Sequence, residues 1–145
     1  MADREKRDLS FFFPDKVGKR EQSFTLEVSN RFKDDEGKAV KFEFEFPSHE
    51  KFKEIKKAAS RQVRKGNKMS FEYDQYGMYI KAITECNIYP NFKTAELQDM
   101  YKTTSPKELI EKMLYPDEIE KLGQDLSIKI GLVDDPIDLV DDAKN

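Results

Sequence analysis

The sequence predicts an α+β fold, in which an N-terminal antiparallel β-hairpin, with room for a third short strand, packs on a C-terminal bundle of about four to five short α-helices. Two observations lead to this fold class. Apolar residues alternate with polar residues in two stretches, 24–29 and 41–46, on either side of a turn. Beyond residue 74, apolar residues recur at helical spacing behind proline or capping residues.

The length of 145 residues suits one domain, and we expect residues 1–145 to form it. Residues 1–20 are expected to be a flexible N-terminal arm, 22–73 a β-rich part with one helix, and 74–145 a helical part. Charged residues make up 38% of the chain and hydrophobic residues 37%. This balance predicts a small core beneath a heavily solvated surface.

An apolar cluster follows the charged first residues and ends at Pro14. It consists of Leu9, Phe11, Phe12 and Phe13. Such a cluster can fold back onto the core or dock into a partner. We expect packing on the core, with docking as the alternative.

The hairpin is predicted by two alternating stretches. Phe24 leads the first and Phe44 lies in the middle of the second, while the turn formers Asp and Gly lie between them in 33–38. One phenylalanine face should be buried and the opposite charged face solvated. A two-stranded ribbon is marginal alone, so helices or a third strand should cover it.

One helix is predicted over residues 49–64, because Ser48 is a good N-cap and apolar residues follow at helical spacing. Gly66-Asn67 is interpreted as its C-terminal cap. Residues 69–73 alternate again and predict a short strand or an extended link.

The remaining chain predicts helices with clear starts. Asp74 can cap a segment that runs to Ile88-Tyr89-Pro90, where proline ends it. Thr94 precedes a short helix, and Ser105-Pro106 is a strong start signal. A further helix is expected to begin at Tyr115-Pro116, and its inward-facing residues are Ile119, Leu122, Leu126 and Ile130. A last short turn is expected over 137–140.

No residue set predicts catalysis, a cofactor or a metal. His49 is the only histidine and Cys86 the only cysteine, so a zinc site built on cysteines and an internal disulfide are both excluded. Cys86 lies among apolar helix residues, which favours a buried thiol. We therefore expect a protein that is not an enzyme, needs no cofactor and works by binding.

Charge is unevenly distributed, at +5 over residues 1–68 and −8 over residues 69–145. This asymmetry permits charge-steered association with a partner or self-association, and it is also compatible with an uneven solvated surface. A basic stripe in the predicted helix leaves nucleic-acid binding open as an alternative, although the sequence pI of about 5.4 argues against it. The candidate nucleic-acid contacts are Lys53, Lys56, Lys57, Arg61 and Arg64.

Several ordered segments resemble one known family. They are Ile88-Tyr89-Pro90-Asn91-Phe92, Ala95-Glu96-Leu97-Gln98 with Tyr101, Ser105-Pro106-Lys107-Glu108-Leu109, Lys112-Met113-Leu114-Tyr115-Pro116-Asp117-Glu118 and Asp138-Leu139-Val140-Asp141-Asp142-Ala143-Lys144-Asn145. Together with the strand, turn and helix pattern around 29–40, they resemble the XkdN-like tail assembly chaperones of long-tailed bacteriophages and prophages. The resemblance covers about residues 22–145. Asp117 departs from the family, where glycine commonly follows the proline, and 122–127 is less typical.

The resemblance implies a non-enzymatic chaperone that binds the phage tape measure protein and keeps it soluble for tail tube assembly, and that is absent from the mature virion. The tail tube protein is a second candidate partner, and the alternative is a nucleic-acid-binding or other phage regulatory protein using helix 49–65. No membrane segment is expected, and the location implied is the cytoplasm of the bacterial host. The residues that we expect to contact the partner are Leu109, Ile110, Met113, Leu114, Ile119, Leu122 and Leu126.

Overall fold

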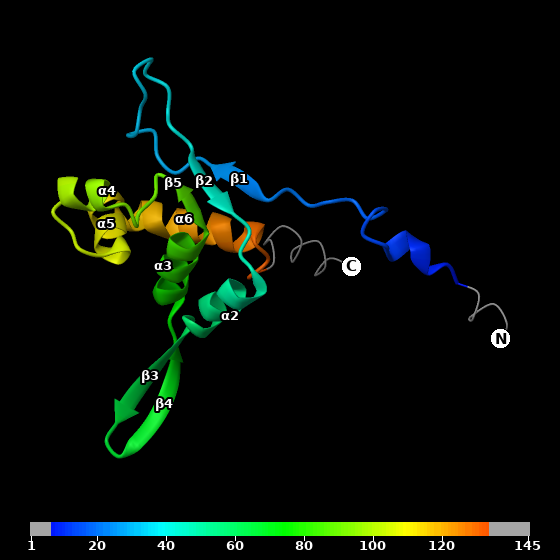
Figure 1. Ribbon diagram of the computed structural model, residues 1–145. Coiled ribbons are helices and arrows are strands. Elements are labelled where there is room, and N and C mark those ends of the chain that lie inside the picture. Colours follow the sequence, from blue (N-terminus) through cyan, green and yellow to red (C-terminus); the bar gives the residue numbers. More distant parts are fainter. Residues whose placement is uncertain (1–6, 134–145) are drawn as a thin grey trace, which may run out of the picture.

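A three-stranded antiparallel sheet and a group of helices form the body of the molecule, which a computed structural model describes over residues 7–133 (Figure 1). The strand order is β1 (Ser23–Leu26), β2 (Phe42–Glu45) and β5 (Asn87–Tyr89), so β2 is central. Strands β1 and β2 form the antiparallel hairpin that the alternation predicts, and Phe24 pairs with Phe44 across it. The α+β class is therefore confirmed.

The other elements surround this sheet or project from it (Figure 1). They are the 3₁₀ helix η1 (Leu9–Phe12), α2 (His49–Lys57), β3 (Ser60–Lys65), β4 (Lys68–Tyr73), α3 (Gln75–Cys86), α4 (Ala95–Met100), α5 (Pro106–Met113) and α6 (Pro116–Lys129). Strands β3 and β4 form a separate two-stranded hairpin.

The core lies between the sheet and the helices α3 and α6. Phe42 and Phe44 from β2 are fully buried, and Phe42 contacts Phe92 with ring centroids 6.1 Å apart. Helices α3 and α6 approach closely because Gly123 has no side chain. A Cβ at that position would overlap the Tyr79 ring and lie 2.6 Å from the Tyr79 Cβ. Gly123 thus sets the spacing of the two main core helices.

The predicted helix starts are found where a side chain caps the helix through a hydrogen bond to a nearby backbone N–H. The Ser48 hydroxyl accepts a hydrogen bond from the Lys51 backbone N–H at 3.3 Å and begins α2. The Asp74 carboxylate accepts from Gly77 at 2.9 Å, and the Ser105 hydroxyl accepts from Glu108 at 3.2 Å. Thr94 occupies the N-cap of α4 without a side-chain bond. These contacts satisfy backbone donors that a helix cannot satisfy itself.

The helix predicted over 49–64 is wrong in its second half. Helix α2 ends at Lys57, and residues 60–65 form strand β3, which pairs with β4 from Ser60↔Tyr73 to Lys65↔Lys68. Gly66 has φ +63° and forms the turn of this hairpin instead of a helix cap. The alternation over 69–73 predicts an extended segment, and strand β4 includes it. Pairing with β4 outweighs the helical spacing of the apolar residues before and within β3.

The third strand of the main sheet comes from the end of the predicted helix at 74–88. Helix α3 stops at Cys86, and residues 87–89 leave it to pair with β2 through Glu43↔Tyr89 and Phe44↔Asn87. The Tyr89–Pro90 peptide bond is cis. The last turn predicted over 137–140 lies outside the described residues.

The N-terminal apolar cluster does not pack on the core, contrary to expectation. It forms η1 on an arm that runs away from the sheet (Figure 1), and its Phe12 is 76% exposed. Ahead of β1, the Arg20 guanidinium lies over the Phe46 ring, 3.6 Å from the ring centroid.

Candidate functional site

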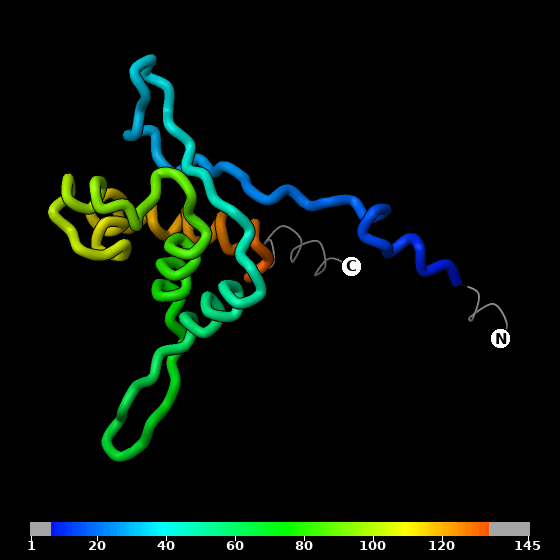
Figure 2. Tube along the Cα trace, in the orientation of Figure 1, coloured from blue at the N-terminus to red at the C-terminus, as the bar shows by residue number. Residues whose placement is uncertain are grey.

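The β3–β4 hairpin presents an apolar face to solvent. Cross-strand partners in a hairpin point to the same face, and residues two apart along a strand share it. Met69, Phe71 and Tyr73 therefore lie in a row on one face, and they are 52%, 71% and 67% exposed. In Figure 2 the hairpin extends from the body beyond α2 and α3. We call this row the hairpin face.

The opposite side of the hairpin is charged. The Arg61 guanidinium lies 3.2 Å from the Glu72 carboxylate, and the Lys65 ammonium lies 3.9 Å from it. These exposed pairs contribute little individually, but they hold the charges on one side of the ribbon. Arg64 pairs with Met69 in the ladder, so its side chain lies on the same side as the hairpin face. The hairpin is an amphipathic element with its apolar side unpaired in the described chain.

The N-terminal arm is the second exposed apolar surface. Leu9, Phe11 and Phe12 are 69%, 67% and 76% exposed. Local contacts order this turn, since the Asp8 carboxylate accepts a hydrogen bond from the Ser10 backbone N–H at 2.8 Å and the Ser10 hydroxyl and N–H lower the pKa of Asp8. Exposed phenylalanines on an element away from the core are typical of a segment that docks elsewhere.

The residues predicted to contact a partner are placed in the core instead. All seven are at most 7% exposed, and they join α5 and α6 to the sheet and to α3: Leu109, Ile110, Met113, Leu114, Ile119, Leu122 and Leu126. A buried side chain contacts a partner only if the fold opens. Their contact with a partner therefore stays a prediction, and the residues of the hairpin face and the arm are further candidates in the folded chain.

The basic residues predicted as nucleic-acid contacts do not share one helix. Lys53, Lys56 and Lys57 lie on α2, whereas Arg61 and Arg64 lie on β3 three residues apart, and so on opposite faces of the hairpin. Arg61 is paired with Glu72. The continuous basic stripe expected of one helix is absent from these residues, and nucleic-acid binding remains an untested prediction.

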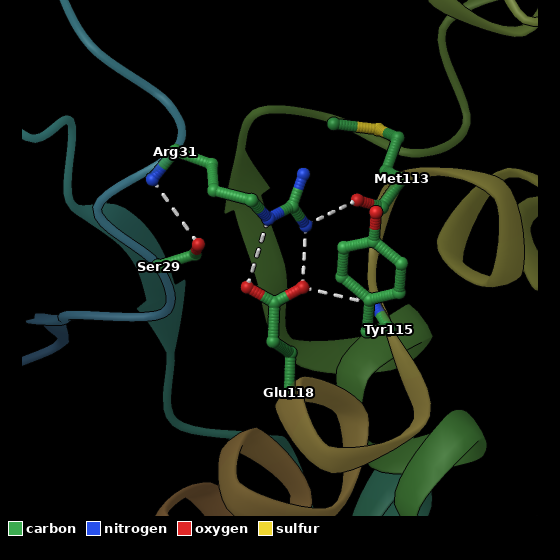
Figure 3. A network of polar contacts seen from close by, with 5 residues as sticks. All are labelled: Ser29, Arg31, Met113, Tyr115 and Glu118. Atoms are coloured by element: carbon green, nitrogen blue, oxygen red, sulfur yellow. Dashed lines mark hydrogen bonds and ion pairs between the residues drawn. The ribbon is translucent and has the colours of Figure 1, made fainter.

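A network of polar contacts around Arg31 and Glu118 lies near the start of α6, and we call it the polar junction (Figure 3). Arg31, in the long connection between β1 and β2, binds both carboxylate oxygens of Glu118, and its Nη2 donates to the Met113 carbonyl at 2.9 Å. Its guanidinium also lies 4.7 Å from the centre of the Tyr115 ring. One arginine thus ties the connection to the corner between α5 and α6.

The same carboxylate caps α6. A Glu118 oxygen accepts the Tyr115 backbone N–H at 2.9 Å, which closes a capping box. The Arg31 guanidinium is the main reason that the pKa of Glu118 falls to about 2, with the Ser29 hydroxyl and the Tyr115 N–H adding to the effect and burial opposing it. The junction thus joins the β1–β2 connection to the first turn of α6.

The side chains that catalysis or metal binding would need are dispersed over the described residues. Burial raises the pKa of the Cys86 thiol to about 12, the nearby Lys51 ammonium opposing and the Glu45 carboxylate adding to the rise. His49 lies in the first turn of α2. Within residues 7–133, no group of three or more His, Cys, Asp or Glu is placed to hold a metal ion. None of the helices described is both long and apolar enough to cross a membrane.

The hairpin face could have been found from the sequence. The alternation of Met69, Phe71 and Tyr73 with polar residues is the pattern of a half-buried strand, and Gly66-Asn67 is one of the two-residue turns that join hairpin strands. Only the structure shows that the apolar side remains exposed.

Comparison with known proteins identifies the family. The model of the phage XkdN-like tail assembly chaperone protein family matches residues 9–144. The chain is 34% identical to the protein YqbN of Bacillus subtilis (strain 168), over 95% of this chain and 93% of that protein. It is 31% identical to the phage-like element PBSX protein XkdN of the same strain, over 95% and 94%. The crystal structure of the protein YqbN superposes with a TM-score of 0.65 at 29% identity and covers 88% of this chain and 98% of that one. The chain belongs to the phage XkdN-like tail assembly chaperone family.

Proposed function

We propose that this chain binds the tape measure protein of its phage, covers that protein's apolar stretches and keeps it soluble until the tail tube forms around it. The tail tube protein is a second proposed partner. The chain would act in the cytoplasm of the bacterial host, without catalysis, and would be absent from the mature virion. Membership in a tail assembly chaperone family supports the general role.

One structural observation supports binding to an apolar partner. The hairpin face and the N-terminal arm expose large apolar side chains on two elements that project from a well-filled core (Figure 1). When such side chains pack against an apolar segment, they leave water. This burial stabilises the complex by about 25 cal/mol for each Å² of apolar surface covered. Several separate contacts of this kind give binding that can be reversed when the tube assembles.

Co-expression with the tape measure protein of the same phage tests this function. We expect the tape measure protein to stay in the soluble fraction and to co-purify with the chain, and to aggregate without it. If its solubility is the same with and without the chain, the proposed function is wrong.

Matched substitutions locate the surface. Phe71, Phe12 and Met100 are 71%, 76% and 78% exposed, so replacing each with Ser removes a similar exposed group. We expect Phe71→Ser and Phe12→Ser to reduce co-purification, whereas Met100→Ser, on α4 and outside both surfaces, leaves it unchanged. If all three variants reduce co-purification equally, the hairpin face and the arm are not the binding surface.

A further inference from the structure

We infer that the N-terminal arm of one chain docks on a second copy of the chain, with a phenylalanine of η1 in a pocket between the first turns of α3 and α6. The phenylalanines of η1 are exposed in the chain itself. We call the site the tyrosine pocket, and it is lined by Gln75, Tyr76, Tyr79, Pro116 and Glu120. This contact goes beyond the proposed function, because it joins two copies of the chain and involves no other protein.

The arm presents a compact aromatic turn with a cation beside it. The Phe13 carbonyl accepts a hydrogen bond from the Lys16 backbone N–H at 2.9 Å, so the chain turns again after η1. The Lys16 ammonium lies 5.9 Å from the centre of the Phe11 ring and donates to the Ser10 hydroxyl at 3.3 Å. Residues 7–20 contain four basic and two acidic residues, a net charge of +2. Apolar side chains and positive charge therefore meet in one short segment.

The tyrosine pocket is large enough for one aromatic ring. Its volume is about 160 Å³, and a cavity of about 150 Å³ holds a benzene molecule. Tyr76, Tyr79 and Pro116 supply ring surfaces to its lining. Tyr76 is 41% exposed, so an incoming phenylalanine would cover aromatic surface that now faces water.

Carboxylates surround this pocket. Glu120 lines it, and Asp117 follows its Pro116 in the sequence. The Tyr76 hydroxyl donates to the Glu111 carboxylate at 2.7 Å. Among the described residues, Glu111, Asp117 and Glu120 have no Lys or Arg within ion-pair distance. An aromatic turn that carries a cation therefore matches the pocket in both shape and charge.

Charge favours this pocket over the hairpin face as the site for the arm. The hairpin over residues 60–73 contains four basic residues and one acidic residue, a net charge of +3. The arm is basic as well, and like charges brought together disfavour a contact. The hairpin face is therefore left open for a different partner.

The direction of the arm favours a second copy. The Lys129 ammonium lies 5.5 Å from the centre of the Phe24 ring, so β1 lies near the end of α6. The pocket lies at the start of α6, and this helix of 14 residues is roughly 21 Å long. The arm leaves β1 on the side away from α4 and α5 (Figure 1). A contact between copies lets the arm keep this direction, and it leaves one arm and one pocket free for further copies.

Small-angle X-ray scattering of the full-length chain tests for this self-association. The concentration series extends to about 1 mM, which populates even weak contacts. We expect the average mass at low salt to rise with protein concentration above the 17.0 kDa of one chain. Added salt should lower it again, because the charges are exposed. A mass of one chain throughout the series would overturn the inference.

Reversed charges test whether the arm meets the pocket. Lys16→Glu and Glu120→Lys should each weaken self-association by roughly threefold or more. An equal mixture of the two variants should restore it, because each arm then finds a pocket of opposite charge. The matched controls Lys33→Glu and Asp99→Lys change exposed residues elsewhere and should self-associate as the wild type does. A mixture no stronger than its separate components contradicts the inference.

Two phenylalanine variants distinguish the pocket from the hairpin face. Phe12 is 76% exposed on the arm, and Phe71 is 71% exposed on the hairpin face. We expect Phe12→Ser to weaken self-association by roughly tenfold or more, because a buried phenylalanine is lost from the contact. Phe71→Ser should leave it unchanged. If Phe71→Ser weakens it as strongly, the arm docks on the hairpin face and the inference is wrong.

Paramagnetic relaxation in a mixed sample shows which copy supplies the arm. A nitroxide is attached to Gly18→Cys, where an added Cβ meets no atom within 4 Å, and the native Cys86 is fully buried. This chain, of natural isotope content, is mixed with isotope-labelled chain that carries no nitroxide. We expect amide signals of 75–79 and 117–120 to lose intensity, while those of 68–71 keep theirs.

Undiminished signals of the pocket in this mixture would overturn docking between copies. None of these measurements involves the tape measure protein. Their failure would therefore leave the proposed function untouched.

Discussion

The guanidinium of Arg31 and the carboxylate of Glu118 meet across 87 positions of sequence and join the long β1–β2 connection to the first turn of α6. Both oxygens of Glu118 are engaged, one of them also by the Tyr115 backbone N–H. Paired charge-assisted hydrogen bonds of this type are stronger than neutral ones. The contact fixes a connection that has little regular structure of its own.

Removing this carboxylate should change the dependence of stability on pH. The pKa of Glu118 is about 2 in the fold, below the usual 4.5, so its stabilisation is present above pH 4.5 and is lost as pH falls towards 2. We expect Glu118→Gln to lower Tm by a few degrees at pH 7 and to lessen the loss of stability between pH 5 and pH 2. Thermal unfolding across this range measures both effects. Glu120→Gln, at an exposed position of the same helix, is the control, and a parallel profile for wild type and Glu118→Gln would contradict the prediction.

A methyl group at Gly123 should destabilise the fold. Ala is favoured over Gly in a helix by about 1 kcal/mol, but the added carbon would overlap the Tyr79 ring and force α3 and α6 apart. We expect Gly123→Ala to lower the free energy of unfolding by about 1–3 kcal/mol, as measured by urea denaturation. The combination of Gly123→Ala with Tyr79→Ala should recover part of the loss. A stabilised single variant would show that the two helices are not closely packed.

Removing the hydroxyl of Ser127 should stabilise the fold, unlike the substitution of Gly123. It is fully buried on α6 and has no hydrogen-bond partner among the described residues. Burying an unpaired hydroxyl costs about 1–3 kcal/mol. We therefore expect Ser127→Ala to raise the free energy of unfolding by up to about 1 kcal/mol, while Thr103→Ala, which removes a hydroxyl that donates to the Gln98 carbonyl at 3.3 Å, should lower it. A marked loss in Ser127→Ala would mean that the hydroxyl has a partner.

The thiol of Cys86 should be unreactive in the folded chain. Burial raises its pKa to about 12, so the thiolate fraction near pH 8 is negligible and access is closed. We expect alkylation at pH 8 to proceed only as fast as the chain unfolds, and to become rapid in denaturant. Mass spectrometry after timed exposure to iodoacetamide measures this. Rapid labelling of native protein would show that α3 opens readily.

The two phenylalanine-bearing ribbons should respond differently to substitution. Phe44 in β2 is fully buried, whereas Phe71 in β4 is 71% exposed. We expect Phe44→Ala to cost about 3–5 kcal/mol, and Phe71→Ser to change stability by no more than about 0.5 kcal/mol. Denaturation of both variants gives the comparison. A large loss for Phe71→Ser would mean that the hairpin face supports the fold.

Local signals predicted their elements well. Ser105 and Asp74 cap helices through bonds to residues three positions away, so everything needed lies within one turn. The antiparallel pairing of β1 with β2 was likewise predicted from alternation on both sides of a turn. Such features require no knowledge of the distant chain.

Features that depend on distant pairing were not predicted. Val63 continues the helical spacing of Ile55 and Ala59, yet residues 60–65 form a strand because β4 pairs with them. Residues 87–89 leave α3 because β2 has a free edge. The seven residues expected to contact a partner are buried, and that contact stays a prediction, since an apolar helix face predicts burial but does not distinguish a partner from the chain's own core.

The hairpin of β3 and β4 enters and leaves the body at one place, between α2 and α3 (Figure 1). Its strands pair with each other and belong to a different sheet from β1, β2 and β5. Changes in its length or side chains are thereby insulated from the packing around Phe44. The fourteen residues 60–73 therefore form a cassette that we expect can be exchanged as a unit while the packing around Phe44 stays unchanged.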